Sequence, residues 1–181
     1  GGTGLGHLEL VLIAQEVGRA LAPIPFSSSV YLATEALVQF GSEEQKKRWL
    51  PGLCSGERIG TFAAVEFLGD PELDEVEASF SGGKLSGTKV PVLDGDVANV
   101  AVVLAKDGDG HSLLVVDLAG SGVSNSSLDS FDPSRSQARL VFDGADAEVL
   151  GEAGKGIAQA TRLLDCAAVM MGFEQIGGSE R

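Results

Sequence analysis

The sequence is poor in cysteine and has no long apolar run. Its 181 residues include two cysteines, Cys54 and Cys166, which are too few for a disulfide framework and are typical of a reducing compartment. We expect both to be ordinary buried or half-buried thiols. No stretch of about 18 uncharged apolar residues occurs, and the first residues lack the basic-then-apolar order of a signal peptide. The sequence therefore predicts no membrane span, and the expected location is the cytoplasm.

Basic residues are also scarce. Lys and Arg together number 13 against 26 Asp and Glu, which gives a net charge of −13. Because binding to a phosphate backbone needs clustered Lys and Arg, nucleic acid is excluded as a partner. Hydrophobic residues make up 44% of the chain, which predicts a folded core. The chain opens at Gly1 without a Met and stops at Arg181 just after an amphipathic pattern, so we expect it to be part of a longer polypeptide.

Apolar residues at spacings of three and four predict two helices at the start of the chain. The first should end at Pro23 and Pro25, because proline cannot continue a helix. The second should begin with Ser29 as its N-cap and end at Gly41 in the left-handed conformation. The two apolar stripes consist of Leu10, Ala14, Val17 and Leu21, and of Val30, Ala33, Leu37 and Phe40.

A third, shorter helix is predicted to follow directly. Residues 42–45, Ser-Glu-Glu-Gln, have the order of a capping box, and Pro51 is expected to end the helix. The basic run at residues 46–48 is most simply a solvated face of this helix. Trp49 should pack beneath it.

From Ile59 the apolar period changes to two, which predicts strands. Ile59, Thr61, Ala63 and Val65 should share one face, with Phe62 and Ala64 on the other. Further strands, divided by Gly- and Asp-rich turns, are expected at residues 75–80, 84–93, 97–105, 112–118 and 139–142. Short strands at this spacing predict a small antiparallel barrel or sandwich, with a Ser-rich loop near residues 121–130.

A last helix is predicted after a glycine-rich hinge at residues 150–156. Its apolar stripe consists of Ile157, Ala160, Leu164, Ala167 and Met171, widened by Leu163, Met170 and Phe173. Burying each larger side chain would stabilise the fold by roughly 1.5–3 kcal/mol, so this helix needs a packing partner. The predicted class is α+β: the end of a helical domain (1–58), a β-domain (59–150) and the first helix of a C-terminal bundle (151–181).

Several short motifs resemble functional sites but have simpler interpretations. The Gly-rich start at residues 2–6 lacks the preceding strand and spacing of a nucleotide-binding loop, so we interpret it as a flexible lead-in. Residues 81–84 match the S-x-x-K of serine acyl enzymes but fall between two strands, where we expect a hairpin turn. Residues 107–110 lack the further ligands of a calcium loop.

The titratable residues give no metal or acid–base motif either. His7 and His111 have no nearby Cys or His, so we expect them to be solvent-exposed and predict no metal site. The carboxylates of residues 70–77 have no apolar surroundings that would separate their pKa values. A solvated acidic loop is the expected structure, and it comprises Asp70, Glu72, Asp74, Glu75 and Glu77.

Residues 41–66 join the capped helix, its end and the first strand in an order typical of one family. The matching residues are Gln45, Lys46, Lys47, Leu50, Pro51, Ser55, Gly56 and Glu57. Val65 and Glu66 fall where that family reads Thr-Glu-Pro. On these residues the chain resembles the acyl-CoA dehydrogenases. The resemblance implies a helical N-terminal domain, a middle antiparallel β-domain and a C-terminal four-helix bundle, with FAD held between the β-domain and the bundles.

The resemblance places the flavin-facing residues on two strands, at Phe62, Ala64, Val65, Val92 and Leu93. Val65 replaces a family Thr, and residues 91 and 93, Pro and Leu, replace the Trp and Thr of a Trp-Ile-Thr motif. Each lost hydroxyl donor would weaken flavin binding by about 0.5–1.5 kcal/mol. Backbone donors could still hold the cofactor.

The implied activity is FAD-dependent oxidation of an acyl-CoA to a trans-2-enoyl-CoA, a reaction of lipid metabolism and fatty acid β-oxidation. The implied partners are an acyl-CoA, an electron-transfer flavoprotein as acceptor, and further subunits in a homo- or hetero-oligomeric dimer or tetramer. The family's Glu base lies in the C-terminal bundle, so no residue here is assigned as catalytic and the chain alone is expected to be inactive. The net charge of −13 would slow encounter with an anionic CoA unless a partner supplies basic residues.

Two alternatives stay open. The chain could belong to a non-catalytic partner subunit of a hetero-oligomeric acyl-CoA dehydrogenase, which Pro91 and Leu93 favour. It could also be a β-barrel binding module with helical flanks, without enzymatic activity.

Overall fold

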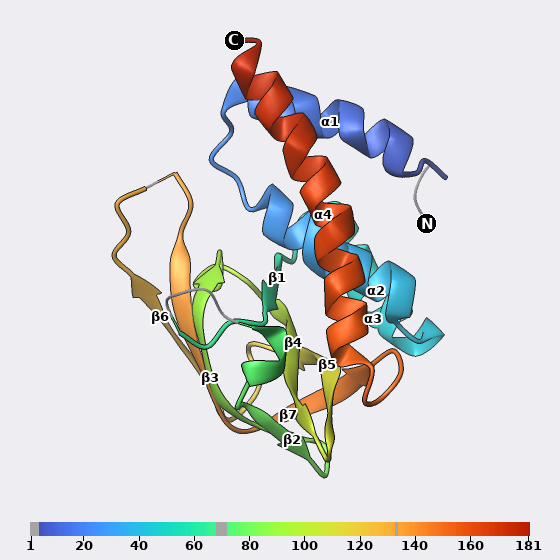
Figure 1. The fold of residues 1–181 in the computed structure, drawn as a ribbon, viewed down its shortest axis with the longest axis vertical. Helices are drawn as coiled ribbons and strands as arrows, with labels where there is room; N and C mark the ends of the chain where they lie inside the picture. Colours follow the sequence, from blue (N-terminus) through green and yellow to red (C-terminus); the bar gives the residue numbers. More distant parts are fainter. Residues whose placement is uncertain (1–3, 68–71, 133) are drawn as a thin grey trace.

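The computed structural model describes residues 4–67, 72–132 and 134–181. The helical elements are α1 (His7–Ala20), η1 (Ser27–Thr34), α2 (Glu35–Phe40), α3 (Glu43–Ser55), the 3₁₀ turn η2 (Leu73–Glu75) and α4 (Gly156–Ser179). The strands are β1 (Gly60–Ala63), β2 (Ser79–Ser81), β3 (Lys84–Leu93), β4 (Val100–Asp107), β5 (Gly110–Asp117), β6 (Val123–Leu128) and β7 (Gln137–Leu150). The helices gather at one end and the strands at the other (Figure 1), which confirms the predicted α+β class.

The strands form a small barrel. Neighbouring strands follow the order β1-β4-β2-β3-β7-β5, and a further β4–β5 pairing closes the ring, while β6 pairs with β7. Most pairs are antiparallel, as predicted, but β1 and β2 both run parallel to β4. The register of β3 against β7 shifts between Lys89 and Val92, so an irregularity lies at the C-terminal half of β3.

Two apolar clusters hold the fold together. The larger one fills the barrel and extends to the helices that cover it, and it includes Leu37, Trp49, Leu104, Leu140 and Leu163. The smaller one joins α1, η1 and α4 through Ala14, Tyr31, Ala167 and Met170. The helical end and the barrel therefore share one continuous packing surface along η1 and α4.

The first and last helices cross at glycines. A Cβ atom at Gly18 would overlap the carbonyl oxygen of Glu174, and one at Gly177 would overlap that of Gln15. The two backbones can approach this closely only because neither position carries a side chain.

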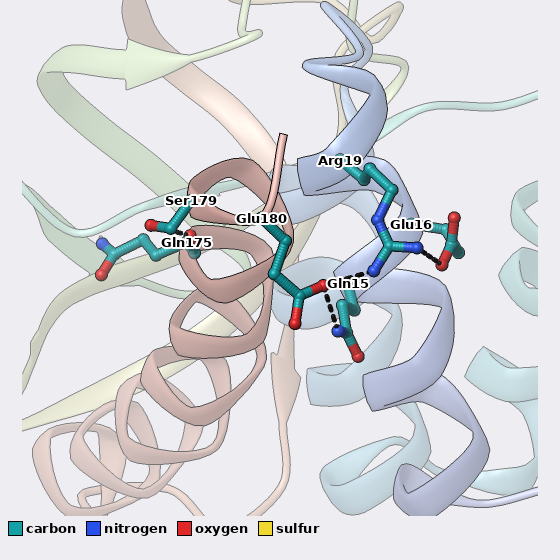
Figure 2. A network of polar contacts seen from close by, with 6 residues as sticks. All are labelled: Gln15, Glu16, Arg19, Gln175, Ser179 and Glu180. Carbon is teal, nitrogen blue, oxygen red and sulfur yellow. Dashed lines mark hydrogen bonds and ion pairs between the residues drawn. The ribbon is translucent and has the colours of Figure 1, made fainter.

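Polar contacts surround this crossing (Figure 2). Gln15 Nε2 donates to Glu180 Oε2 at 2.9 Å, and Arg19 contacts both Glu16 and the same Glu180 carboxylate. These side chains are exposed or partly exposed, so their contacts contribute little to stability and serve mainly to orient α1 and α4 relative to each other. The neighbour that the last helix needs is thus partly provided by α1.

The capping box of α3 forms as predicted. Gln45 N–H donates to Ser42 Oγ at 3.2 Å, and Ser42 N–H donates to Gln45 Oε1 at 3.0 Å. Trp49 is buried beneath α3, also as predicted, with the guanidinium carbons of Arg48 and Arg58 4.6 and 4.8 Å from its ring centroid. These features depend on neighbours a few residues away, which explains why the sequence alone predicts them.

Ser42→Ala should remove one of these capping bonds and lower the free energy of unfolding by about 1 kcal/mol. Urea denaturation would measure the loss. Ser55→Ala, at the other end of α3, is a suitable control because its exposed hydroxyl also bonds local backbone groups but is not part of the capping box. Equal losses in both variants would contradict a specific capping role for Ser42.

Several predicted element ends are wrong. The second helix begins at Ser27 as the π-helical segment η1, because the hydroxyls of the serine cluster find partners outside the helix. Gly41 is extended, with φ −65° and ψ 143°, since the chain passes directly into the cap of α3. Pro51 lies inside α3, which ends instead at the left-handed Gly56 with φ 78°.

The predicted strands also need correction. Residues 75–80 form the end of η2 and the short β2, not one strand, and β7 extends over residues 137–150. The Ser-rich stretch expected to be a loop contains β6, whose polar side chains are mostly exposed while its backbone pairs with β7. A strand held by backbone pairing alone needs no alternation of apolar and polar residues, so the sequence pattern does not predict it.

Side-chain burial differs from expectation at several positions. On α4 the buried apolar residues are Ala160, Leu163, Ala167 and Met170, whereas Leu164 and Met171 are exposed. Cys54 is exposed, and only Cys166 is half-buried.

The short motifs behave largely as expected. His7 is exposed beside Glu35, but His111 is half-buried, and its Nε2 has no partner among the described residues. Residues 81–84 and 107–110 form hairpin turns, as predicted. Glu72, Asp74, Glu75 and Glu77 are exposed, as predicted, whereas Asp70 and residues 2 and 3 lie outside the described residues.

Candidate functional site

The two strands predicted to face a flavin lie next to each other. Val90 N–H donates to the Val65 carbonyl oxygen at 2.9 Å, and Thr61 Oγ1 donates to the Leu93 carbonyl oxygen at 2.6 Å. These two bonds place the C-terminal half of β3 alongside β1 and the residues that follow it. The irregular register of β3 between Lys89 and Val92 falls within this contact. We refer to residues 61–66 and 90–93 together as the β1–β3 wall.

The five predicted flavin-facing residues differ in exposure. Phe62, Val65 and Leu93 are half-buried, so part of each side chain reaches the surface of the wall. Ala64 and Val92 belong to the barrel core, with exposures of 5% and 0%. The structure therefore brings all five positions together, but the side chains of Ala64 and Val92 point to the core, so only their backbone could meet a ligand.

The backbone after β1 offers hydrogen-bond donors. Among the hydrogen bonds between residues that the structure describes, none uses the amide N–H of Ala64 or Val65. A buried amide without a partner is costly, so such groups are normally paired with protein, water or ligand. Acceptors on the edge of a planar heteroaromatic ring would suit them. This property fits the FAD site that the resemblance implies.

A buried ion pair between Lys89 and Glu66 links the β1–β3 wall to the neighbouring strands. Lys89 Nζ lies 2.7 Å from Glu66 Oε1 and 3.3 Å from the Ala64 carbonyl oxygen, and the Lys89 side chain is 0% exposed. The Glu66 carboxylate also accepts from the N–H groups of Ala78 and Glu77 at 2.8 and 2.6 Å. The pair thus ties together the residues after β1, the middle of β3 and the residues before β2.

The pair changes the acidity of both groups. Burial lowers the pKa of Lys89 to about 8, against the hydrogen bond and the charge of Glu66, which raise it. Burial alone would raise the pKa of Glu66, but the hydrogen bonds from Lys89 and from the two backbone amides outweigh it, so the pKa lies below its ordinary value of 4.5. Both groups are therefore charged at neutral pH.

A second polar cluster lies where β3 ends. Asp94 Oδ2 accepts from Ser28 Oγ at 2.6 Å, and Asp94 N–H donates to the Ser136 carbonyl oxygen at 2.9 Å. Nearby, Arg135 donates to Ser27 Oγ at 2.6 Å and lies 3.6 Å from the Glu174 carboxylate, which accepts from the Tyr31 hydroxyl. Burial, then the Glu174 carboxylate, raises the pKa of Tyr31, so its hydroxyl keeps its proton.

Sequence reasoning missed these polar clusters. Nothing in the spacing of Lys89 and Glu66 shows that they form an ion pair, since 23 residues separate them. Of the serines at 27–29, only Ser29 is assigned a role from the sequence, as a helix N-cap. Their contacts with Asp94 and Arg135 depend on the packing of η1 against the barrel.

The described residues offer no metal centre and no membrane helix. Among residues 4–67, 72–132 and 134–181, no group of three or more His, Cys, Asp or Glu side chains is placed to hold a metal ion. In the same part of the chain, no helix is both long and apolar enough to cross a membrane.

Comparison with known proteins identifies the family. Residues 1–57 match the model of the acyl-CoA dehydrogenase N-terminal domain. Over 128 residues the chain is 34% identical to acyl-CoA dehydrogenase FadE27 of Mycobacterium tuberculosis, covering 71% of this chain and 34% of that protein.

Solved structures agree with the sequence match. A Bacillus anthracis acyl-CoA dehydrogenase complexed with FAD superposes with a TM-score of 0.88 at 29% identity, over 98% of this chain and 32% of the other. A chain of the ChsE4–ChsE5 complex of Mycobacterium tuberculosis superposes with a TM-score of 0.82 at 30% identity, over 97% of this chain and 48% of the other.

The barrel with helices at one end has the fold of these acyl-CoA dehydrogenase structures. The chain belongs to the acyl-CoA dehydrogenase family, of whose members it spans between about a third and a half. The predicted resemblance is confirmed. The FAD-bound relative also supports FAD as the cofactor of this kind of site.

Proposed function

We propose that this chain forms the β-domain side of an FAD site in an enzyme that oxidises an acyl-CoA thioester to a 2-enoyl-CoA. The observation that carries the proposal is the β1–β3 wall, in which the amide N–H groups of Ala64 and Val65 have no partner among the described residues. When bound, FAD supplies the acceptor for the hydride that leaves the substrate. The catalytic base would come from outside the chain, as the family resemblance implies.

The residues of the wall would hold and shelter the cofactor. The amides of Ala64 and Val65 would donate to ring acceptors, while the half-buried Phe62, Val65 and Leu93 would exclude water from one side. Backbone donors are not changed by the replacement of hydroxyl side chains at 65 and 93. This explains how a site with these substitutions could still bind flavin, with lower affinity.

The test uses the full-length protein that carries this chain. We expect the purified protein to be yellow and to lose its absorbance near the flavin maximum when an acyl-CoA is added. Val65→Arg would place a charged side chain on the wall and should lower flavin occupancy, whereas Ser124→Arg on the exposed strand β6 should leave it unchanged. A protein that stays colourless after incubation with FAD, alone and with candidate partner chains, would rule the proposal out.

A second candidate is a partner subunit in a hetero-oligomeric acyl-CoA dehydrogenase. It is favoured by Pro91 and Leu93, which lack the aromatic ring and hydroxyl of the family motif, and by the similarity to one chain of the two-protein ChsE4–ChsE5 complex. In that case flavin would appear only after mixing with a second, unlike chain.

We further propose a cytoplasmic location, a role in fatty acid β-oxidation or related lipid metabolism, and an electron-transfer flavoprotein as acceptor.

A further inference from the structure

Asp94 occupies an unusual position at the end of the β1–β3 wall. It follows Leu93 directly, is 4% exposed, and has a φ of 55°, in the left-handed region that few residues other than glycine adopt. Asp tolerates this conformation better than most residues, at a cost of about 1 kcal/mol. The conformation turns the chain out of β3, and Val97 and Ala98 N–H groups both donate to the Asp94 carbonyl oxygen.

Asp94 joins three parts of the molecule. Its Oδ2 accepts from Ser28 of η1 at 2.6 Å, and its N–H donates to the carbonyl oxygen of Ser136, just before β7, at 2.9 Å. The Ser136 hydroxyl lies 3.5 Å from Asp94 Oδ1 but is closer to Asp96 Oδ1, at 2.7 Å. Ser28 is 1% exposed, and its other acceptor is the Pro25 carbonyl oxygen at 3.3 Å. No ion pair between described residues includes Asp94. Among the described residues, the carboxylate is therefore held mainly by the Ser28 hydroxyl and not by a cation.

The contacts of Asp94 help to position the backbone of Leu93. The carbonyl oxygen of Leu93 accepts from Thr61 on one side, and its neighbour Asp94 is fixed to η1 and to residue 136 on the other. If the Asp94 carboxylate were removed, the end of β3 would lose this hydrogen bond to η1. The spacing between β3 and the residues after β1 would then be less well defined, although the barrel core would stay intact.

We propose that Asp94 is a positioning residue for the FAD site, acting through the backbone of Leu93 and not by touching the cofactor. This inference rests on the proposed function. It assigns Ser28 of η1 a role in flavin binding, because Ser28 supplies the hydrogen bond that holds Asp94 in place. Small displacements in a preorganised site cost affinity even when the fold persists.

The test compares three variants of the full-length protein. Asp94→Gly removes the carboxylate while allowing the left-handed backbone, and Asp94→Asn keeps an oxygen that can accept from Ser28. Asp96→Gly is the matched control, because Asp96 accepts from Ser136 at 2.7 Å and from Ser127 at 3.1 Å, but none of its hydrogen bonds to described residues involves η1. FAD affinity is measured by fluorescence titration, the flavin environment by the absorption bands of bound FAD, and stability by the Tm of the apoprotein.

We expect Asp94→Gly to weaken FAD binding about tenfold and to shift the flavin bands, since a hydrogen bond to a charged group is lost. Asp94→Asn should stay within about threefold of the wild type, and Asp96→Gly should leave affinity and spectrum unchanged. Wild-type affinity and spectrum in Asp94→Gly, or equal losses in Asp96→Gly, would overturn the inference while leaving the proposed function intact. A wild-type protein that binds no FAD would overturn both.

Discussion

Glu66→Gln is expected to lower the free energy of unfolding by about 3 kcal/mol, because it leaves the ammonium group of Lys89 buried without a counter-charge. Lys89→Met should also destabilise the protein, but less, since the Glu66 carboxylate keeps two backbone N–H donors and is partly exposed. The double variant should be more stable than Glu66→Gln alone, because it contains no unpaired charge. Denaturant titration of the four proteins completes the cycle.

Lys84→Met provides the matched control for this cycle. Lys84 lies on the same strand and pairs with Asp146 at 2.6 Å, but both side chains are largely exposed. Its loss should change stability little. If Lys84→Met and Lys89→Met lowered the free energy of unfolding equally, the buried pair would contribute no more to stability than the exposed pair.

The same pair predicts how stability depends on pH. The pKa of Glu66 is lower in the folded protein than its ordinary value of 4.5, so its contribution is fully present above that value and is lost as the pH falls. The difference in unfolding free energy between the wild type and Glu66→Gln should therefore shrink at acidic pH. The pKa of Lys89 is also lowered, to about 8 from the ordinary 10.5, so the penalty for burying its charge is relieved as the pH rises from 8 to 10.5. Both groups therefore make the free energy of unfolding rise with pH, each in its own pH range.

Gly177→Ala should destabilise the protein by about 3 kcal/mol or more, although alanine is the better helix former. The added methyl group would overlap the backbone of α1 at Gln15, which cannot move without separating the two helices. Denaturant titration would give the global loss, and hydrogen exchange should show it concentrated in α1 and the C-terminal half of α4.

Gly172 of the same helix offers a direct comparison. A Cβ atom there meets nothing within 4 Å, so Gly172→Ala should stabilise the protein by about 0.5–1 kcal/mol. If Gly177→Ala lowered the free energy of unfolding and Gly172→Ala raised it, the close helix crossing would be confirmed. A stabilising Gly177→Ala would contradict it.

How far the sequence alone predicts this structure depends on the range of the interactions. The capping box at Ser42 and the strand at residues 84–93 follow from neighbours in the sequence, and both are confirmed. Helix α3 continues past Pro51, its predicted end, and stops at Gly56, which adopts the left-handed conformation. Strand β6 was missed, since it is held by the backbone of β7 and not by apolar side chains.

The candidate site shows the same division. The family motif predicted which two strands form the wall, and the bonds from Val90 to Val65 and from Thr61 to Leu93 bring those strands together. The individual flavin-facing residues stay predictions. The Lys89–Glu66 pair and the Ser28–Asp94 bond could not be predicted, because each joins residues that only the folded barrel brings together.

The crossing of α1 and α4 also has a consequence for biosynthesis. Gln15 and Glu180, which bond across it, are 165 residues apart. A ribosome that has released α1 must still translate the entire barrel before α4 emerges, so the part of α1 that packs against α4 stays uncovered throughout that interval. Contacts this distant form late and leave a nascent chain open to aggregation. Protection of α1 by a chaperone would therefore be needed for longest during synthesis of the strands.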